Sequence, residues 1–304
     1  MDVLGMRLTL RDFPAEQFLW GLGAATFALV MAMILTHGRA PRTRAAVPGL
    51  LVVAAALGAV GRTWPVTAST VLGLAGVTLP ALGLWLARRP PAGTTGLVAL
   101  GATVASACLL AADASPTAWV RGFLVAALVV SVPAAGRTDV EHGPAGLTPL
   151  LYAISAAGVF AAVPDTEQAA ALLGASVPLA VRGWPFGDGR LGPPGAGAAT
   201  ALLIWVAAVG GRGREPSIVG AVGCLGLLVT LPAGRWLAGR TGRLRTALRP
   251  RRPVVPIVLV QLGVVALASR VAGVSADLAF ASAVTAAVLL AALAASVLLA
   301  ARPP

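Results

Sequence analysis

Long apolar runs separated by short polar segments extend along the whole chain. Each run is about 16–25 residues long, and about twenty apolar residues cross the hydrocarbon core of a bilayer as an α-helix. Such a helix satisfies its own backbone hydrogen bonds, which lipid cannot do. The pattern therefore predicts an all-α fold, a polytopic transmembrane helix bundle with about ten or eleven spans. The expected spans are 17–36, 46–61, 66–87, 95–112, 117–136, 147–163, 165–182, 197–211, 217–233, 254–272 and 277–301.

The shortest runs leave the span count open. The second and eighth, 46–61 and 197–211, are short enough to tilt into a neighbour or to enter the membrane without crossing it. The segments between the runs are too short for a separate soluble domain, so residues 1–304 are expected to form a single integral membrane domain. Residues 1–16 are too acidic for a signal peptide, and we interpret the first run as a retained helix.

The arginines predict the orientation of the spans. The chain has 23 basic residues, none of which is Lys. With the N-terminus outside, roughly two thirds of the arginines fall in inner segments, as the positive-inside rule requires, and most acidic residues fall outside. This favours about eleven spans with the N-terminus outside and the C-terminus inside. A composition rich in Ala, Gly and Val and without Lys indicates a GC-rich bacterial genome, and hence the bacterial cytoplasmic (inner) membrane.

A pattern that recurs about every fifty residues indicates an internal repeat. Glycines stand near the start of four even-numbered spans, at Gly49, Gly96, Gly146 and Gly197. Prolines open four odd-numbered spans, at Pro65, Pro116, Pro164 and Pro216. We predict one leading helix followed by five helical hairpins, the last one divergent, at 46–95, 96–145, 146–196, 197–252 and 253–304. The alternative is that prolines, which concentrate at span ends, align by chance.

The same odd-numbered spans carry a second proline near their inner ends. These residues are Pro80, Pro133, Pro178 and Pro232, each with a Ser or Thr two positions earlier. A proline inside a helix removes a hydrogen bond and kinks the helix. The nearby hydroxyl is expected to satisfy the freed carbonyl. At the outer ends, Ser115 and Asp165 are expected to cap the helices that follow them.

Strongly polar side chains are rare inside the spans. No Asp or Glu lies near the middle of any run. This disfavours a carrier that relays ions through a buried carboxylate and an enzyme with paired catalytic carboxylates. Gln261 is the deepest strongly polar residue. It is a candidate for binding a polar group of a substrate, and the simpler interpretation is a hydrogen bond between helices worth about 1 kcal/mol.

Charged residues gather at span ends. Asp113, Arg121, Arg270 and Asp277 are expected near the outer ends of helices. The two arginines are candidates for binding an anionic headgroup or substrate, with the two aspartates as local partners. The alternative role is anchoring at the membrane interface, where long basic side chains extend towards water.

The longest inner loop, 234–253, is also the most basic. Its arginines are Arg235, Arg240, Arg243, Arg245, Arg249, Arg251 and Arg252. Near anionic lipid each such charge contributes about 1 kcal/mol. The loop is therefore a candidate for contact with anionic lipids at the inner face or with an acidic protein partner, and it also fits a plain topology determinant.

Several other motifs are explained by packing or lack the signature of a functional site. Gly220, Gly223 and Gly226 give one helix a small face suited to close packing. Cys108 and Cys224 lie in apolar runs and fit small packing residues. The glycine-rich stretch 186–197 lacks the Gly-Lys-Ser/Thr ending of a phosphate loop. With two His in the chain, we expect no metal and no cofactor. The net charge of +12 lies in loops between spans, so no nucleic-acid partner is expected.

Three function classes remain. The first is a transporter or permease for a small or lipid-like substrate, which a pore at the repeat axis lined by the kinked odd-numbered helices would favour. The second is a non-catalytic scaffold or anchor subunit of a larger complex, which a broad apolar outer face would favour. The third, an enzyme acting on lipid-linked substrates, is the least favoured and requires the outer acids to cluster. Those acids are Asp113, Asp165, Glu167 and Asp277.

Overall fold

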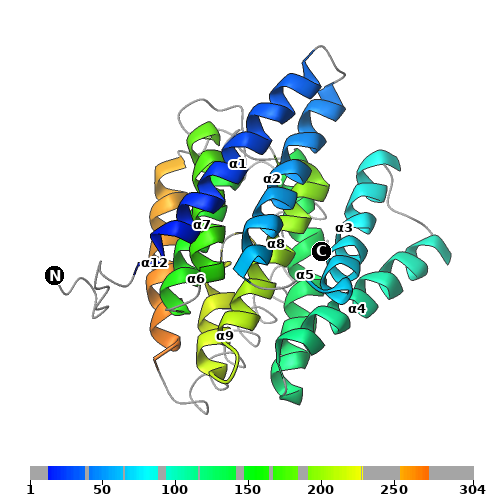
Figure 1. The fold of residues 1–304 in the computed structure, drawn as a ribbon. Coiled ribbons are helices and arrows are strands. Elements are labelled where there is room, and N and C mark those ends of the chain that lie inside the picture. Colours follow the sequence, from blue (N-terminus) through cyan, green and yellow to red (C-terminus); the bar gives the residue numbers. More distant parts are fainter. Residues whose placement is uncertain are drawn as a thin grey trace, which may run out of the picture.

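The computed structural model describes residues 13–37, 41–63, 66–87, 94–115, 117–141, 147–163, 167–183, 191–226, 228 and 254–273. Within these residues the chain forms ten α-helices and no strand (Figure 1). The helices are α1 (Ala15–Thr36), α2 (Pro41–Thr63), α3 (Ala68–Ala87), α4 (Thr94–Ala114), α5 (Ala118–Glu141), α6 (Leu147–Ala162), α7 (Glu167–Gly183), α8 (Gly192–Gly210), α9 (Glu215–Gly223) and α12 (Val254–Val271).

The all-α prediction is confirmed for the described residues. Each helix falls on one of the first ten predicted spans, because long apolar runs without strand-like alternation favour helices. Three of the described helices, α1, α4 and α8, are long and apolar enough by themselves to cross a membrane. The eleventh predicted span, 277–301, lies outside the described residues.

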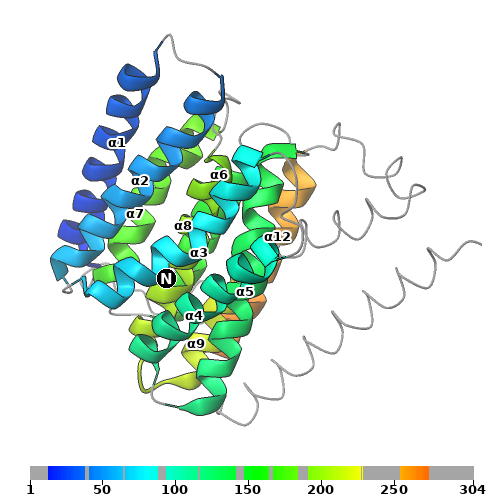
Figure 2. The ribbon, with the colours of Figure 1, turned by 90° about the vertical axis from the view of Figure 1, so that its right-hand side faces the viewer.

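Helix α8 lies at the centre of the bundle. It packs against α2, α3, α4, α5, α6, α7 and α9 (Figures 1 and 2). Of the residues in its most apolar stretch, 94% are buried, compared with 28% in α4 and 22% in α1. The expectation that this span is short was wrong, because the helix begins at Gly192. The prolines in its first turn do not prevent this start, since the amide that each proline lacks would have no helical partner there.

Glycine pairs allow four of the helices to cross closely. At the crossing of α1 and α7, a Cβ atom added to Gly21 would collide with the Ala171 carbonyl, and one added to Gly174 with the Phe18 carbonyl. At the crossing of α2 and α8, a Cβ on Gly195 would lie 2.7 Å from the Gly49 Cα. Small residues allow helix backbones to approach closely where lipid supplies no hydrophobic driving force.

Polar contacts show which helix ends lie together. Ser69 at the start of α3 bonds to Asp113 at the end of α4. Arg212, just after α8, donates to the backbone carbonyl of Asp113. Trp119 at the start of α5 donates to Glu215 at the start of α9, with 3.0 Å from Nε1 to Oε2. The starts of odd-numbered helices therefore meet the ends of even-numbered ones at one end of the bundle, which we call the polar end.

The predicted proline positions that the structure describes lie inside helices, and the predicted rescue of the backbone was wrong at Pro80 and Pro178. Pro80, Pro133 and Pro178 fall within α3, α5 and α7. The amide that Pro80 lacks would have bonded to the Gly76 carbonyl. Thr78 instead donates to the Leu74 carbonyl, with 2.9 Å from Oγ1 to the oxygen. Ser176, two positions before Pro178, likewise donates to Leu173 rather than to Gly174. Pro232 lies outside the described residues.

The packing order does not follow the proposed hairpins throughout. Helices α4 and α5, α6 and α7, and α8 and α9 pack as sequential pairs. Helix α2 packs on α1, α7 and α8, whereas α3 packs on α4, α5 and α8. The fifty-residue repeat stays a prediction.

Candidate functional site

The polar end holds a carboxylate that several hydroxyl groups surround. The Asp113 Oδ2 atom accepts hydrogen bonds from Ser69 Oγ at 2.6 Å, Thr67 Oγ1 at 3.3 Å and Thr70 Oγ1 at 3.4 Å. The Thr67 hydroxyl also accepts from the Thr70 amide at 3.3 Å, as an N-cap does. Asp113 therefore joins the end of α4 to the start of α3 and is satisfied within the protein.

Two arginines bond to the backbone after α4. Arg121 Nε donates to the Ser115 carbonyl, and Arg212 donates to that of Asp113. Cations are favourable there because the last carbonyls of a helix lack partners and carry partial negative charge. Arg121 therefore lies near Asp113, but it bonds to the backbone carbonyl of Ser115 and not to the Asp113 carboxylate. Ser115 does not cap the first turn of α5, which begins at Ala118; its Oγ accepts at 3.4 Å from the amide of Thr117, the residue before the helix.

The remaining predicted outer residues are not joined to this cluster. Arg270 is exposed at the end of α12, and no hydrogen bond or ion pair among the described residues links it to Asp113 or Arg121. Its predicted partner Asp277, the capping candidate Asp165 and the basic-loop arginines lie outside the described residues. Among the residues that the structure describes, no three His, Cys, Asp or Glu side chains form a group suited to a metal ion.

The ninth predicted span is a discontinuous helix. Helix α9 ends at Gly223 and turns follow it, so the predicted span 217–233 is not one continuous helix in its described part; residues 227 and 229–233 lie outside the described residues. After it, amide-to-carbonyl bonds span three residues, as in Leu225 to Val222 and Gly226 to Gly223. Gly226 has a φ of 30°, which disfavours other residues. A stretch of such tighter turns within a helix is typical of a hinge.

Gln261 of α12 stabilises this discontinuity. The Leu228 amide, which would bond the Cys224 carbonyl in an α-helix, donates instead to Leu225. The Gln261 side-chain Nε2 donates to the Cys224 carbonyl at 2.9 Å and to Ser155 Oγ of α6 at 3.1 Å. Gln261 is fully buried. It therefore joins three helices, which is the interhelical role favoured above for this residue.

The small face of α9 packs against α12, as its glycines predicted. A Cβ on Gly220 would lie 2.7 Å from the Ala268 carbonyl, and one on Gly223 would lie 3.2 Å from the Ala268 Cβ. A third glycine, Gly158 of α6, faces the discontinuity from the other side, with its added Cβ 2.8 Å from Cys224 Sγ. The discontinuity is thus enclosed by packed helices, as irregular backbone at membrane depth requires.

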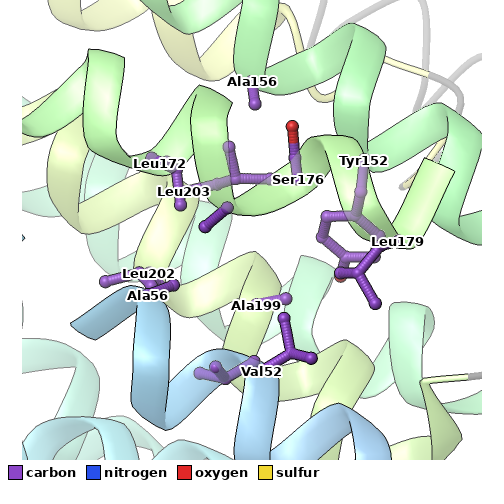
Figure 3. A pocket seen from close by; sticks show the side chains of 12 residues that line it. Val52, Ala56, Tyr152, Ala156, Leu172, Ser176, Leu179, Ala199, Leu202 and Leu203 are labelled. Atoms are coloured by element: carbon purple, nitrogen blue, oxygen red, sulfur yellow. The ribbon is translucent and has the colours of Figure 1, made fainter. Parts of the chain in front are cut away.

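An apolar cavity lies between α2, α6, α7 and α8 (Figure 3). Its volume is about 30 Å³ for the centre of a water-sized sphere, which exceeds the roughly 10–15 Å³ that one water needs. Each helix contributes one alanine to its lining: Ala56, Ala156, Ala175 and Ala199. The polar side chains in its lining are Tyr152 and Ser176.

Tyr152 connects this cavity to α8. Its hydroxyl donates to the Ala196 carbonyl and lies within hydrogen-bond distance of Thr200 Oγ1. Thr200 Oγ1 also donates to the Ala196 carbonyl at 2.9 Å. Tyr152 is the one tyrosine of the chain and lies within an apolar run, but it was not among the predicted site residues.

Comparison with known proteins provides no relative for this site. No family model matches the chain, and no curated protein is significantly similar to it.

Proposed function

We propose that this chain is a multi-pass protein of the bacterial cytoplasmic membrane, with about eleven spans and its polar end outside, and that it transports a small apolar or lipid-like molecule. The discontinuity of α9 is the observation that carries the transport proposal. Discontinuous helices near the middle of the membrane form the substrate and coupling sites of many transporters.

The depth of the discontinuity supports this function. Cys224 lies nine residues beyond Glu215, the first residue of α9, which corresponds to about 13 Å along the helix axis. Gln261 and Ser155 also lie near the middle of their helices. At this depth the amide-to-carbonyl bonds after α9 span three residues, which is typical of a hinge.

The outward-facing side chains support a membrane location. Large apolar residues are exposed on α1, α4 and α12, including Phe27 at 68%, Val98 at 71% and Leu267 at 74%. A soluble protein rarely exposes apolar surface of this extent, whereas lipid covers it at no cost.

The interior supports the substrate class. Buried polar side chains in the described residues include Ser, Thr, Gln and Tyr152, and none of the described buried side chains is Asp, Glu or Arg. A charged substrate crossing such an interior would lack the partner that a buried charge requires. An apolar or amphipathic molecule needs none.

A second candidate function is an anchoring subunit of a larger complex. The position of α8 favours it, because α8 fills the centre, where a pore lined by odd-numbered helices would have favoured transport. The exposed apolar face of α4 is also available to a membrane partner.

Native mass spectrometry after mild detergent extraction separates the two functions. The transport proposal expects a monomer or homo-oligomer that retains an apolar molecule. That molecule, isotopically labelled, should exchange across proteoliposomes, and Gln261→Leu should slow its exchange at least several-fold. A stoichiometric second protein, with no exchange after reconstitution of the purified chain, would favour the anchoring subunit.

A further inference from the structure

We propose that the cavity between α2, α6, α7 and α8 is a binding site for the end of a linear hydrocarbon chain. The inference deepens the proposed function, since it names the class of molecule carried. It rests on the cavity, which is a different observation from the discontinuity of α9.

The cavity lies where four helices each contribute an alanine to one lining. Ala56 of α2, Ala156 of α6, Ala175 of α7 and Ala199 of α8 line it (Figure 3). Larger residues such as Leu203 complete the wall. Protein interiors are close-packed, so a void at such a convergence is unusual. Its lining suits an apolar occupant, because an isolated water there would lack its two to four polar partners.

The two hydroxyl groups of the lining, on Ser176 and Tyr152, and the Thr200 hydroxyl beside Tyr152 disfavour a ligand that needs a hydrogen-bond donor. The Ser176 hydroxyl donates its proton to the Leu173 carbonyl at 2.7 Å. The Tyr152 hydroxyl donates its proton to Ala196, and Thr200 donates to the same carbonyl. A hydroxyl carries one proton, so these protons are committed to the backbone. A carboxylate, phosphate or carbonyl would find no donor among these three groups, whereas a hydrocarbon needs none.

The shape of the lining favours a linear chain over a compact ring. Along α7 the lining residues extend from Leu172 to Leu179, which is about 10 Å along the helix axis. The space inside is small, since the centre of a water-sized sphere can occupy about 30 Å³ of it. An alkyl end is only one methylene wide and therefore needs less width than a compact ring.

Photolabelling tests the site without requiring transport. The full chain is placed in nanodiscs with one of two probes: an alkane with a terminal diazirine, or a phosphatidylcholine with the diazirine at the end of one acyl chain. After irradiation, labelled residues are located by mass spectrometry. We expect labelling of α7 between residues 172 and 179, and the effective probe shows whether the chain comes from a free hydrocarbon or from a lipid.

Two variants of α2 supply the matched comparison. Ala56→Leu fills the cavity, whereas Ala54→Leu adds the same atoms to an exposed position on the same helix. We expect at least a tenfold loss of α7 labelling with Ala56→Leu and no change with Ala54→Leu. If Ala56→Leu fails to fold, Leu203→Ala enlarges the cavity instead and should increase labelling.

The outcomes separate this inference from the proposed function. Labelling confined to exposed residues of α1 and α4 with both probes, or equal labelling in the two α2 variants, would overturn the hydrocarbon site. Exchange of the retained molecule across proteoliposomes would leave the transport function intact in that case. Specific α7 labelling without any exchange would instead support the site and contradict transport.

Discussion

Helices α8 and α4 are alike in length and apolar character, yet they occupy opposite environments. Helix α8 is surrounded by other helices, whereas α4 exposes Leu97, Val98 and Leu100 along its outer face. The first two turns of α8 consist largely of Gly, Ala and Pro, which allow neighbours to approach on every side. Helix α4 confines its small buried residues, such as Ala107 and Ala111, to one face. Hydropathy thus predicts a helix, and side-chain size decides whether it becomes central.

Truncating a large side chain should produce the greatest difference in stability between variants of the two helices. Ile204 of α8 is 1% exposed and Leu100 of α4 is 54% exposed. Ile204→Ala should cost about 2–5 kcal/mol because it leaves a cavity, whereas lipid can fill the space left by Leu100→Ala. Equilibrium unfolding in mixed micelles measures both variants. Equal losses would show that the two helices are packed alike.

Adding one methyl group should destabilise the protein in α8 and stabilise it in α4. Gly195→Ala in α8 meets the backbone of α2, and Gly101→Ala in α4 meets no atom within 4 Å. The first should cost about 1–3 kcal/mol through overpacking. The second should stabilise the protein by up to about 1 kcal/mol, because alanine favours helix over glycine. A stabilising Gly195→Ala would contradict the close crossing of α2 and α8.

Removing the hydrogen bonds that stabilise the discontinuity of α9 should have an intermediate effect on the free energy of unfolding. Gln261→Leu removes both hydrogen bonds to Ser155 and Cys224, and each such bond between membrane helices is worth about 1 kcal/mol. Ser155→Ala removes one of them and should cost about half as much. The same unfolding experiment compares the two. If Ser155→Ala costs as much as Gln261→Leu, the bond to the Cys224 carbonyl contributes nothing.

The smallest effect is expected at the exposed edge of α1. Arg62 lies 3.3 Å from Glu16 and 4.0 Å over the ring of Trp20. Because the ion pair is largely exposed, Glu16→Gln should cost at most about 0.5 kcal/mol, and less at high salt. A thermal transition measured at low and high salt tests this. A large loss that salt leaves unchanged would mean that the pair is shielded from solvent.

Much of the fold was predictable because apolar runs and helices coincide. The start of α8 was missed, since Gly-Pro-Pro-Gly has the composition of a loop. The discontinuity of α9 was missed because it lies inside an apolar run and is stabilised by Gln261 from a helix far along the chain.

The candidate site was predictable only in part. Gln261 and Asp113 stood out as polar residues in an apolar sequence, but their partners Ser155 and Ser69 are ordinary residues distant in sequence. The cavity is lined by alanines that converge from four helices. Hydropathy does not register such a convergence, because alanine is common throughout the chain.

The most direct test of the central claim, that the bundle crosses a membrane with its polar end outside, is cysteine accessibility in intact bacterial cells. In a background with Cys108→Ala and Cys224→Ala, Arg214→Cys places a thiol at the polar end and His37→Cys places one after the far end of α1. A membrane-impermeant maleimide should label Arg214→Cys in intact cells and His37→Cys only after lysis. Labelling of both positions in intact cells, or of His37→Cys alone, would contradict this arrangement.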